Sequence, residues 1–350
     1  MASSRLTETI GGLTEITDAR QWDSLIQSSR LGHPLQLWAW GELKRLNGWE
    51  PHRLALVRGG ATIAAGQLLF WRIPAWGKTV AYLPRGPVGE VSDARVFLAG
   101  AAAYARAHGA LYLRIEPAWT SDDMRTAGLP SNWLRSPDGI LLGDTYTLDL
   151  TKDEDELRAA MRGKTRQYIR KAEHSGISVE RDTTGERLPD MWRIYQETAT
   201  RADFGLHSFA YYQRLFELYG PRNGLYCAMV EGQAEAFLWL VEGGGVAFEL
   251  YGGVTERGGA RKANYPLKWR AIADMKRAGC SLYDFNGRLN EGVSQFKTGF
   301  GPDETEYAGT YDLPLDRLGY LAWRKLWPLA KPIGRKVLGA RQSLTAFSTS

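Results

Sequence analysis

The hydrophobic pattern of the first 150 residues predicts helices followed by a β-meander. Two helices are expected at 17–29 and 38–46, where apolar residues recur at helical spacing. Runs rich in β-branched and aromatic residues, bounded by Gly and Pro, then predict strands. The later elements are the strands HRLALVRG, TIAAGQLLFWRI and TVAYLPRGPV, an Ala-rich helix at 92–107, and the strands ALYLRIEP and DTYTLDLT.

A similar order of elements recurs after a long charged helix expected at 153–174. The later elements are helices at 187–201 and 208–219, the strands GLYCAMVEG, QAEAFLWLVEG and GVAFELYGGV, a helix at 260–278 and the strand SLYDFNG. The repeated helix–helix–meander–helix–strand order predicts two α/β units of similar topology. We expect the first domain to comprise residues 1–150 and the second residues 151–315.

The C-terminal segment is basic and contains apolar positions. Its cations are Arg317, Arg324, Lys325, Lys331, Arg335, Lys336 and Arg341, and no acid lies among them. Pro328 and Pro332 would kink or break a helix. The segment is expected either to pack back as a helix, 316–340, that completes the first domain, or to touch an anionic membrane surface. Both hold if the helix packs by one face only.

Composition narrows the class of protein without naming a partner. The chain has 350 residues, of which 44% are apolar, and a net charge of +5 that permits a phosphate-rich partner without requiring one. The start of the chain has no apolar signal region, and no stretch approaches the about 20 apolar residues of a membrane span. We therefore expect a soluble, cytoplasmic protein. Cys227 and Cys280 lie in apolar runs and are expected to be buried, reduced thiols.

A row of arginines is the first candidate binding feature. Arg158, Arg162, Arg166 and Arg170 recur every four residues, with Lys164 beside them. On one continuous helix these side chains would form a single cationic row. Contact with phosphate or RNA explains such a row, and an inter-domain ladder of ion pairs is the alternative.

A glycine-rich segment, residues 283–311, is the second feature. Lys297 lies there between Phe296 and Phe300, where aromatic neighbours would lower the local dielectric constant. A lysine in such a place can stabilise a developing oxyanion or bind phosphate, although lysines that pack their stems between surface aromatics are also common. The five histidines are scattered without metal-ligand spacing, so no metal site is expected.

Several segments together resemble the FemABX family, the non-ribosomal peptidyltransferases that build peptidoglycan cross-bridges. The segments are QLWAWGELKRLNGWEP, YLPRGPV, LYLRIEP, KTRQYIRKAEHSGISVE, SFAYYQRL, FELYGG and YDFNGRLNEGVSQFKTGFGPDETEYAG. They span most of residues 35–315 in the order typical of the family.

The resemblance implies a fold and a reaction. The fold would be α/β (α+β), two GNAT-like acyltransferase domains in tandem, with the C-terminal helix returning to the first. The donor would be aminoacyl-tRNA carrying Gly, Ala or Ser, with no cofactor. The acceptor would be the stem-peptide amine of lipid II or UDP-MurNAc-pentapeptide. The chain looks like the compact type, without the helical hairpin of the staphylococcal members, and nothing in it demands more than a monomer.

Matching motifs also imply roles for particular residues. Lys44 and Arg85 match basic positions that face the acceptor's diphosphate and sugar, and Tyr211 and Tyr251 match aromatics of the acceptor pocket. Lys297 matches a lysine proposed to steady the tetrahedral intermediate or the tRNA end.

Two further positions leave alternatives open. Glu116 falls where a relative has an acid, and is expected either to orient or deprotonate the attacking amine or to pair with Arg114 or another neighbour. Ser208 replaces an arginine that grips the acceptor in a relative, which keeps open a different acceptor, such as a secondary-metabolite peptide. The tRNA-binding set is expected to be Arg158, Arg162, Lys164, Arg166 and Arg170.

Two other classes of function compete with this interpretation. An acetyl-CoA-dependent acetyltransferase would use a glycine-rich turn at a helix start for pyrophosphate, and the nearest stretch, TERGGARKANY, lacks its spacing. A non-enzymatic RNA- or membrane-binding scaffold would leave the matched pocket residues unexplained.

Overall fold

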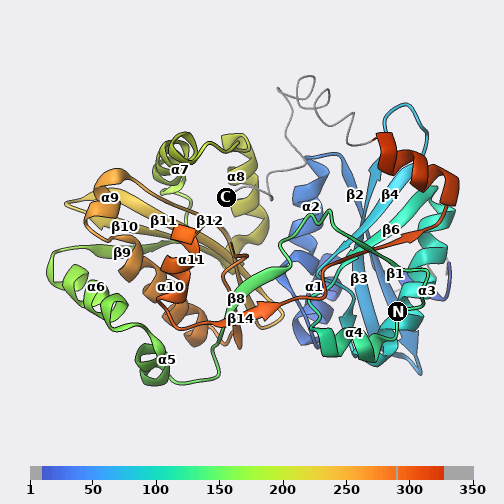
Figure 1. Cartoon of the computed structure of the whole chain (residues 1–350), viewed down its shortest axis with the longest axis horizontal. Helices are drawn as coiled ribbons and strands as arrows, with labels where there is room; N and C mark the ends of the chain where they lie inside the picture. Colours follow the sequence, from blue (N-terminus) through green and yellow to red (C-terminus); the bar gives the residue numbers. More distant parts are fainter. Residues whose placement is uncertain (1–9, 289–290, 327–350) are drawn as a thin grey trace, which may run out of the picture. The chain divides into compact units, whose positions relative to one another are not determined.

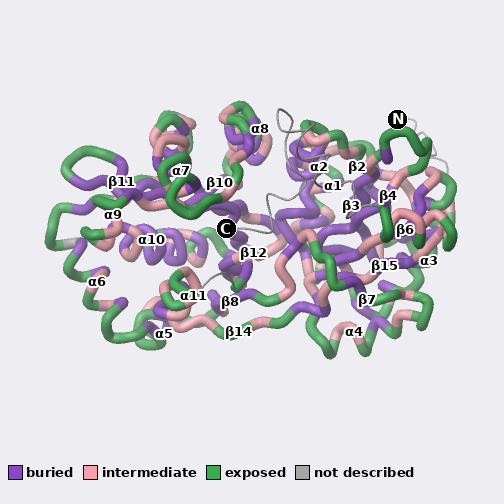
Figure 2. The backbone as a smooth tube through the Cα atoms, turned by 45° about the horizontal axis from the view of Figure 1, so that its top comes forward, coloured by how far each residue is buried: buried purple, intermediate pink, exposed green. Residues whose placement is uncertain are grey.

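The computed structural model describes residues 10–288 and 291–326, which form two α/β units (Figure 1). The first unit contains the described residues up to Gly143 and those from Glu306 onward, and the second comprises Asp144–Thr305. Each unit has its own β-sheet, and the central strands of each sheet are buried along most of their length (Figure 2). Among the described residues, every helix is too short or too polar to span a lipid bilayer.

The sheet of the first unit has the strand order β1-β2-β3-β4-β6-β15-β7, with β5 paired to β3. The strands are β1 (Leu13–Glu15), β2 (Trp49–Arg58), β3 (Ala61–Arg72), β4 (Thr79–Pro84), β5 (Val88–Gly89), β6 (Ala110–Glu116), β7 (Leu134–Ser136) and β15 (Thr310–Pro314). Strands β4 and β6 pair in parallel. That pair requires a crossover, which contains α3 (Val91–Ala107).

Helix α3 covers the core of the first unit. Its Phe97 and Leu98 pack over Leu68, Leu83 and Leu113 of the sheet, each at most 1% exposed. The other helices of this unit that precede Gly143 are α1 (Ala19–Ser28), η1 (Pro34–Gln36), α2 (Trp38–Arg45) and α4 (Ser121–Ala127). The expected helices at 17–29, 38–46 and 92–107 are therefore confirmed, within two residues at each end.

The second sheet has the order β14-β8-β13-β12-β11-β10-β9. Its strands are β8 (Asp144–Asp149), β9 (Ser178–Asp182), β10 (Asn223–Val230), β11 (Gln233–Gly243), β12 (Val246–Val254), β13 (Leu282–Asp284) and β14 (Asp303–Glu306). The helices are α5 (Glu154–Ala160), α6 (Gly163–His174), α7 (Leu188–Ala202), α8 (Phe209–Tyr219), η2 (Gly220–Arg222), α9 (Glu256–Ala260), α10 (Asn264–Arg277) and α11 (Glu291–Thr298). Strands β12 and β13 pair in parallel, and α10 lies in the crossover between them.

Both faces of β11 are buried, which explains its nearly continuous apolar sequence. Leu238 and Leu240 belong to the core cluster that α10 covers. Successive side chains of a strand alternate between faces, so Phe237 and Trp239 point to the other side. There they contact aromatic residues of α7 and α8.

The structure differs from the expected domain division at strand 144–151. This strand, expected in the first domain, pairs with β13 in the second sheet, with Asp149 opposite Leu282. The chain returns to the first unit at Glu306 rather than after residue 315, because β15 pairs with β6. Residues 317–326 are helical and belong to this unit, and residues 327–340 of the expected 316–340 helix lie outside the described residues.

Candidate functional site

Arg85 lies in a tight loop that follows β4. Its backbone adopts a left-handed conformation, with φ at 52°, and its N–H donates to the Glu116 carbonyl at 2.8 Å. The guanidinium lies 4.2 Å from the Tyr307 ring centroid and donates to the Leu142 carbonyl at 3.0 Å. Arg85 is therefore a buried, oriented cation, held by neighbours from three segments of the chain.

Lys44 is another buried cation of the first unit. It lies in the last turn of α2, is 7% exposed, and places its ammonium 4.1 Å from the Trp40 ring centroid. Burial lowers the pKa of Lys44 to about 7. Lys44 can therefore change its charge near neutral pH.

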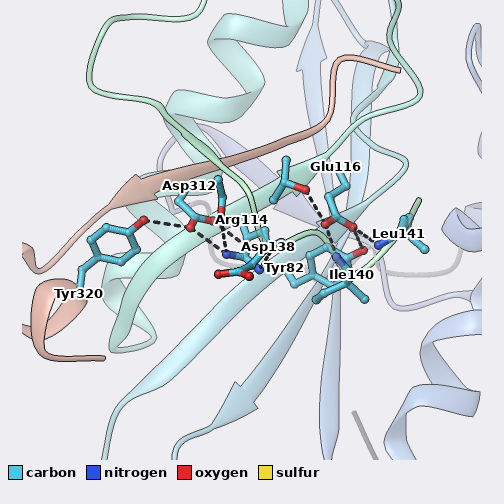
Figure 3. Close-up of polar contacts among 10 residues, drawn as sticks. Tyr82, Arg114, Glu116, Asp138, Ile140, Leu141, Asp312 and Tyr320 are labelled. Atoms are coloured by element: carbon cyan, nitrogen blue, oxygen red, sulfur yellow. Dashed lines mark hydrogen bonds and ion pairs between the residues drawn. The ribbon is translucent and has the colours of Figure 1, made fainter. Parts of the chain in front are cut away.

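Glu116 lies at the end of β6 and accepts four hydrogen bonds (Figure 3). One carboxylate oxygen accepts from the Tyr82 hydroxyl at 2.5 Å and the Leu141 N–H at 2.9 Å. The other accepts from the Ile140 N–H at 2.6 Å and the Thr310 hydroxyl at 2.8 Å. The carboxylate thus ties the loop after β7 to β4 and β15.

Arg114, the neighbour expected as one possible partner of Glu116, pairs with a different acid. It forms a bidentate ion pair with Asp312, at 2.7 and 2.9 Å, and Asp312 also accepts from the Tyr320 hydroxyl at 3.0 Å (Figure 3). Arg114 and Glu116 are two residues apart on β6 and therefore point to the same face of the sheet. They belong to separate polar groups nonetheless, because each is saturated by its own partners.

We expect Glu116→Gln to destabilise the first unit by roughly 2–3 kcal/mol, because an amide replaces a charged acceptor of several hydrogen bonds. Urea unfolding monitored by tryptophan fluorescence measures the change. Glu90→Gln, at the exposed start of α3, is the matched control and should change stability little. An unchanged unfolding free energy for Glu116→Gln would show that these four bonds contribute nothing net.

Lys297 lies near the end of α11 and is 5% exposed. Its ammonium donates to the carbonyls of Phe285 at 2.8 Å and Gly287 at 2.9 Å, with a longer contact of 3.4 Å to Asn286. Burial lowers the pKa of Lys297 to about 8. The side chain is therefore mostly protonated at neutral pH and has one weakly engaged N–H.

The loop that receives Lys297 follows β13 and is fixed by a polar network. Asn286 and Gly287 have positive φ angles of 52° and 94°. The Asp284 carboxylate accepts from the Thr145 hydroxyl at 2.6 Å and the Asn286 N–H at 2.8 Å. The Thr145 hydroxyl accepts from the Gly287 N–H at 2.8 Å. These bonds hold the carbonyls toward the lysine.

A buried ion pair beside this loop was not predicted from the sequence. Lys268 of α10 and Glu249 of β12 are 5% and 6% exposed and form a close ion pair. The Tyr283 hydroxyl donates to the same Glu249 oxygen at 2.6 Å. The Lys268 ammonium lies 5.0 Å from the Phe285 ring centroid. The sequence signal that could have indicated the pair is a charged residue between apolar neighbours, both in α10 and in β12.

Tyr211 and Tyr251 belong to one aromatic cluster of the second unit. Their rings lie 5.7 and 5.2 Å from the ring of Tyr212, centroid to centroid. Tyr211 also stacks on His207 at 4.0 Å. Burial raises the pKa of both tyrosines, so both phenols are neutral at physiological pH. The structure therefore brings these two predicted residues together.

The expected single helix at 153–174 is wrong, and so is its continuous arginine row. The helix breaks at Met161, so Arg158 lies on α5 while Arg166 and Arg170 lie on α6. The Arg162 N–H donates to the Gly299 carbonyl at 2.9 Å, and this hydrogen bond fixes the backbone between α5 and α6. Arg166 donates to carbonyls at the end of α5, including that of Ala159 at 3.0 Å.

The other predicted cations of this region are exposed. Arg162, Lys164 and Arg170 are exposed, and the Arg158 guanidinium lies 4.3 Å from the Trp269 ring centroid. Arg166 is thus a helix-capping residue in the structure, and the remaining four stay candidates for RNA contact. Elsewhere in the unit, Cys227 and Cys280 are buried free thiols, as expected.

Comparison with known proteins places the chain in a family. The FemAB family profile matches residues 17–139, 138–236 and 231–326, and the chain belongs to this family. The lipid II:glycine glycyltransferase of Staphylococcus aureus (strain MRSA252) is 27% identical over 232 residues, which cover 63% of this chain and 53% of that protein. The chain thus spans about half the length of the curated relatives it matches.

Solved structures confirm the expected fold class. The crystal structure of FemX matches with a TM-score of 0.80 and 20% identity, covering 89% of this chain and 99% of FemX. The C-terminal domain (DUF2156) of a putative lysylphosphatidylglycerol synthetase from Agrobacterium fabrum matches with a TM-score of 0.54 and 12% identity, covering 84% and 91%. At these identities the matches show the fold alone.

Proposed function

We propose that this chain is an aminoacyltransferase that moves Gly, Ala or Ser from aminoacyl-tRNA to the stem-peptide amine of a peptidoglycan precursor. The observation that carries the proposal is the buried ammonium of Lys297 in a chain of the FemAB family. The Staphylococcus aureus relative is a lipid II:glycine glycyltransferase, and its activity supports this class of reaction. Lipid II and UDP-MurNAc-pentapeptide are the proposed acceptors.

The proposed reaction is the aminolysis of an ester. The acceptor nitrogen forms a bond to the aminoacyl carbonyl carbon, and the bond between that carbon and the ester oxygen breaks. The proton lost by the nitrogen is taken up by the ester oxygen, which leaves as the ribose hydroxyl of the tRNA. The weakly engaged N–H of Lys297 would donate to the oxyanion in place of its 3.4 Å contact with Asn286. Alignment of two bound substrates supplies much of the remaining acceleration. No covalent enzyme intermediate or cofactor is part of the proposal.

Four further residues are proposed to bind the acceptor. In the first unit, Lys44 and Arg85 are buried cations suited to a diphosphate. In the second, Tyr211 and Tyr251 offer neutral phenols and aromatic surface. Glu116 is proposed to position the loop after β7, since its oxygens already accept four hydrogen bonds. We propose a monomer that acts on the cytoplasmic side of the membrane.

The direct test measures transfer of radiolabelled Gly, Ala and Ser from charged tRNA to each of the two acceptors, with RNase-treated controls. RNase-sensitive labelling of either acceptor is the expected result and identifies both substrates. Folded protein that labels neither acceptor would contradict the proposal. Labelling of a non-wall peptide would favour secondary-metabolite tailoring, and transfer from acetyl-CoA would favour the acetyltransferase alternative.

Peripheral membrane contact is proposed for the helix at 317–326. Tyr320 is buried and Trp323 contacts Trp71 and Trp76, which fixes one face of the helix on the first unit. Leu318 and Leu321 are 82% and 57% exposed. Apolar residues among cations suit an anionic lipid surface.

We expect Leu318→Ser/Leu321→Ser to weaken binding to vesicles containing anionic lipid by about tenfold, because two apolar side chains no longer enter the interface. Vesicle co-sedimentation measures the change. Val96→Ser, at an exposed apolar position of α3, is the matched control. If the unaltered protein and both variants bind the vesicles equally, the helix at 317–326 does not contact the membrane.

A further inference from the structure

Two lysine ammonium groups lie close to one aromatic ring of the second unit. Tyr168 of α6 is half-buried, and the ammonium groups of Lys164 and Lys262 lie 5.8 and 5.7 Å from its ring centroid. Both distances fall within the range of cation–π contacts. The three residues come from the first two turns of α6 and the turn that precedes α10.

Neighbouring residues fix the positions of Tyr168 and Lys262. Tyr265 packs against Tyr168 with ring centroids 4.9 Å apart, and it packs in turn on Phe296 at 5.0 Å. The turn at Lys262 is fixed because the Lys262 N–H donates to the Gly259 carbonyl and the Tyr265 N–H donates to the Lys262 carbonyl, both at 3.1 Å. A chain of aromatic side chains therefore connects Tyr168 to the residue before Lys297.

Among the described side chains, neither Lys164 nor Lys262 has an acidic partner, because no carboxylate oxygen lies within 4.0 Å of either ammonium group. Arg261, beside Lys262, differs because it pairs with Glu231 at 2.9 Å. The two ammonium groups beside the Tyr168 ring therefore give this surface an excess of positive charge, which attracts an anionic ligand.

We propose that Tyr168, Lys164 and Lys262 form a contact site for single-stranded RNA, with a base on the phenol ring and phosphates on the ammonium groups. Single-stranded nucleic acid is recognised by aromatic stacking together with cations that follow the backbone. An acidic protein surface would use the cations and gain nothing from the ring. The inference rests on the proposed function, since it takes RNA as the donor's carrier, and it adds Tyr168 and Lys262 to the RNA-contacting residues predicted from the sequence.

The test is fluorescence anisotropy with a labelled RNA hairpin that ends in a single-stranded 3′ segment, compared with the same hairpin made blunt. Tyr168→Ala is expected to weaken binding of the single-stranded form about 5- to 140-fold, as the loss of one stacked base would, and the blunt form much less. Tyr168→Phe should bind like the unaltered protein. If Tyr168→Ala does not fold, Tyr168→Leu keeps the bulk without the π face and should show the same loss.

The lysines are tested through the salt dependence of binding. Lys164→Ala/Lys262→Ala should lower the magnitude of the log–log salt slope by about 1.4, or about 0.7 for each phosphate that an ammonium group neutralises. Lys152→Ala, at an exposed position of the same unit, is the control for a simple loss of charge. Weaker binding by the lysine variant with unchanged binding by Tyr168→Ala would overturn the stacking site and indicate a purely electrostatic interaction.

These binding measurements do not depend on transfer. Normal RNA binding that responds to Tyr168, without transfer to either acceptor, would contradict only the proposed function. RNase-sensitive transfer by a Tyr168→Ala protein with unchanged affinity for the single-stranded RNA would contradict only the inference.

Discussion

Lys297→Met is expected to lower kcat for aminoacyl transfer by about 10²–10³, while the acceptor KM changes little. The ammonium would act on charge that develops only in the transition state, so its removal affects the rate more than the binding of either substrate. Initial rates at several acceptor concentrations, with tRNA saturating, separate the two parameters.

The same role fixes the direction of the pH dependence. Burial lowers the pKa of Lys297 to about 8, and only the protonated form can donate to an oxyanion. The Lys297-dependent part of kcat is therefore full below a pH of about 8 and is lost as the pH rises through that value. Lys297→Met should lack this alkaline decline.

Lys276→Met is the matched control for Lys297. The Lys276 ammonium also donates to a carbonyl of the second unit, that of Leu150 at 3.0 Å, but no proposed substrate contact involves it. Its kcat should stay close to that of the unaltered protein. A raised acceptor KM with unchanged kcat in Lys297→Met would assign the residue to binding, and a loss matched by Lys276→Met would assign it to folding.

The regular elements could be predicted because their sequences carry strong periodic signals. The run QAEAFLWLVEG became β11, and the Ala-rich segment became α3, since burial against a neighbouring layer decides both patterns. Strand β9 was missed because its exposed alternate residues, as in SVERD, give no apolar pattern. Helix α4 is only 7 residues long and depends on the capping box of Thr120 and Asp123.

The errors at the site came from contacts between distant segments. The break at Met161 depends on Gly299, whose carbonyl accepts from the Arg162 N–H, and no local signal in an arginine-rich helix indicates that partner. The ion pair of Lys268 with Glu249 joins a helix to a strand 19 residues away. Sequence periodicity places each charge on an apolar face but does not say that the two charges meet.

Removing either partner of this ion pair is expected to destabilise the second unit by roughly 3–5 kcal/mol, because the other charge remains buried without compensation. The variants are Lys268→Met and Glu249→Leu, and urea unfolding measures each. Lys268→Met/Glu249→Leu should cost less than the sum of the two, since no buried charge is left. Its remaining cost includes the Tyr283 hydroxyl, which loses its acceptor.

The pH dependence of Glu249→Leu separates an uncompensated charge from lost packing. Burial lowers the pKa of Lys268 below its usual value, and Glu249 opposes that shift, so removal of Glu249 should lower the pKa further. The unfolded chain then binds a proton that the folded chain releases, and the stability of Glu249→Leu rises with pH up to the ordinary lysine range. A deficit that stays constant between about pH 7 and pH 10 would mean that packing, rather than the unpaired ammonium, accounts for the loss, because a cavity has no proton to release.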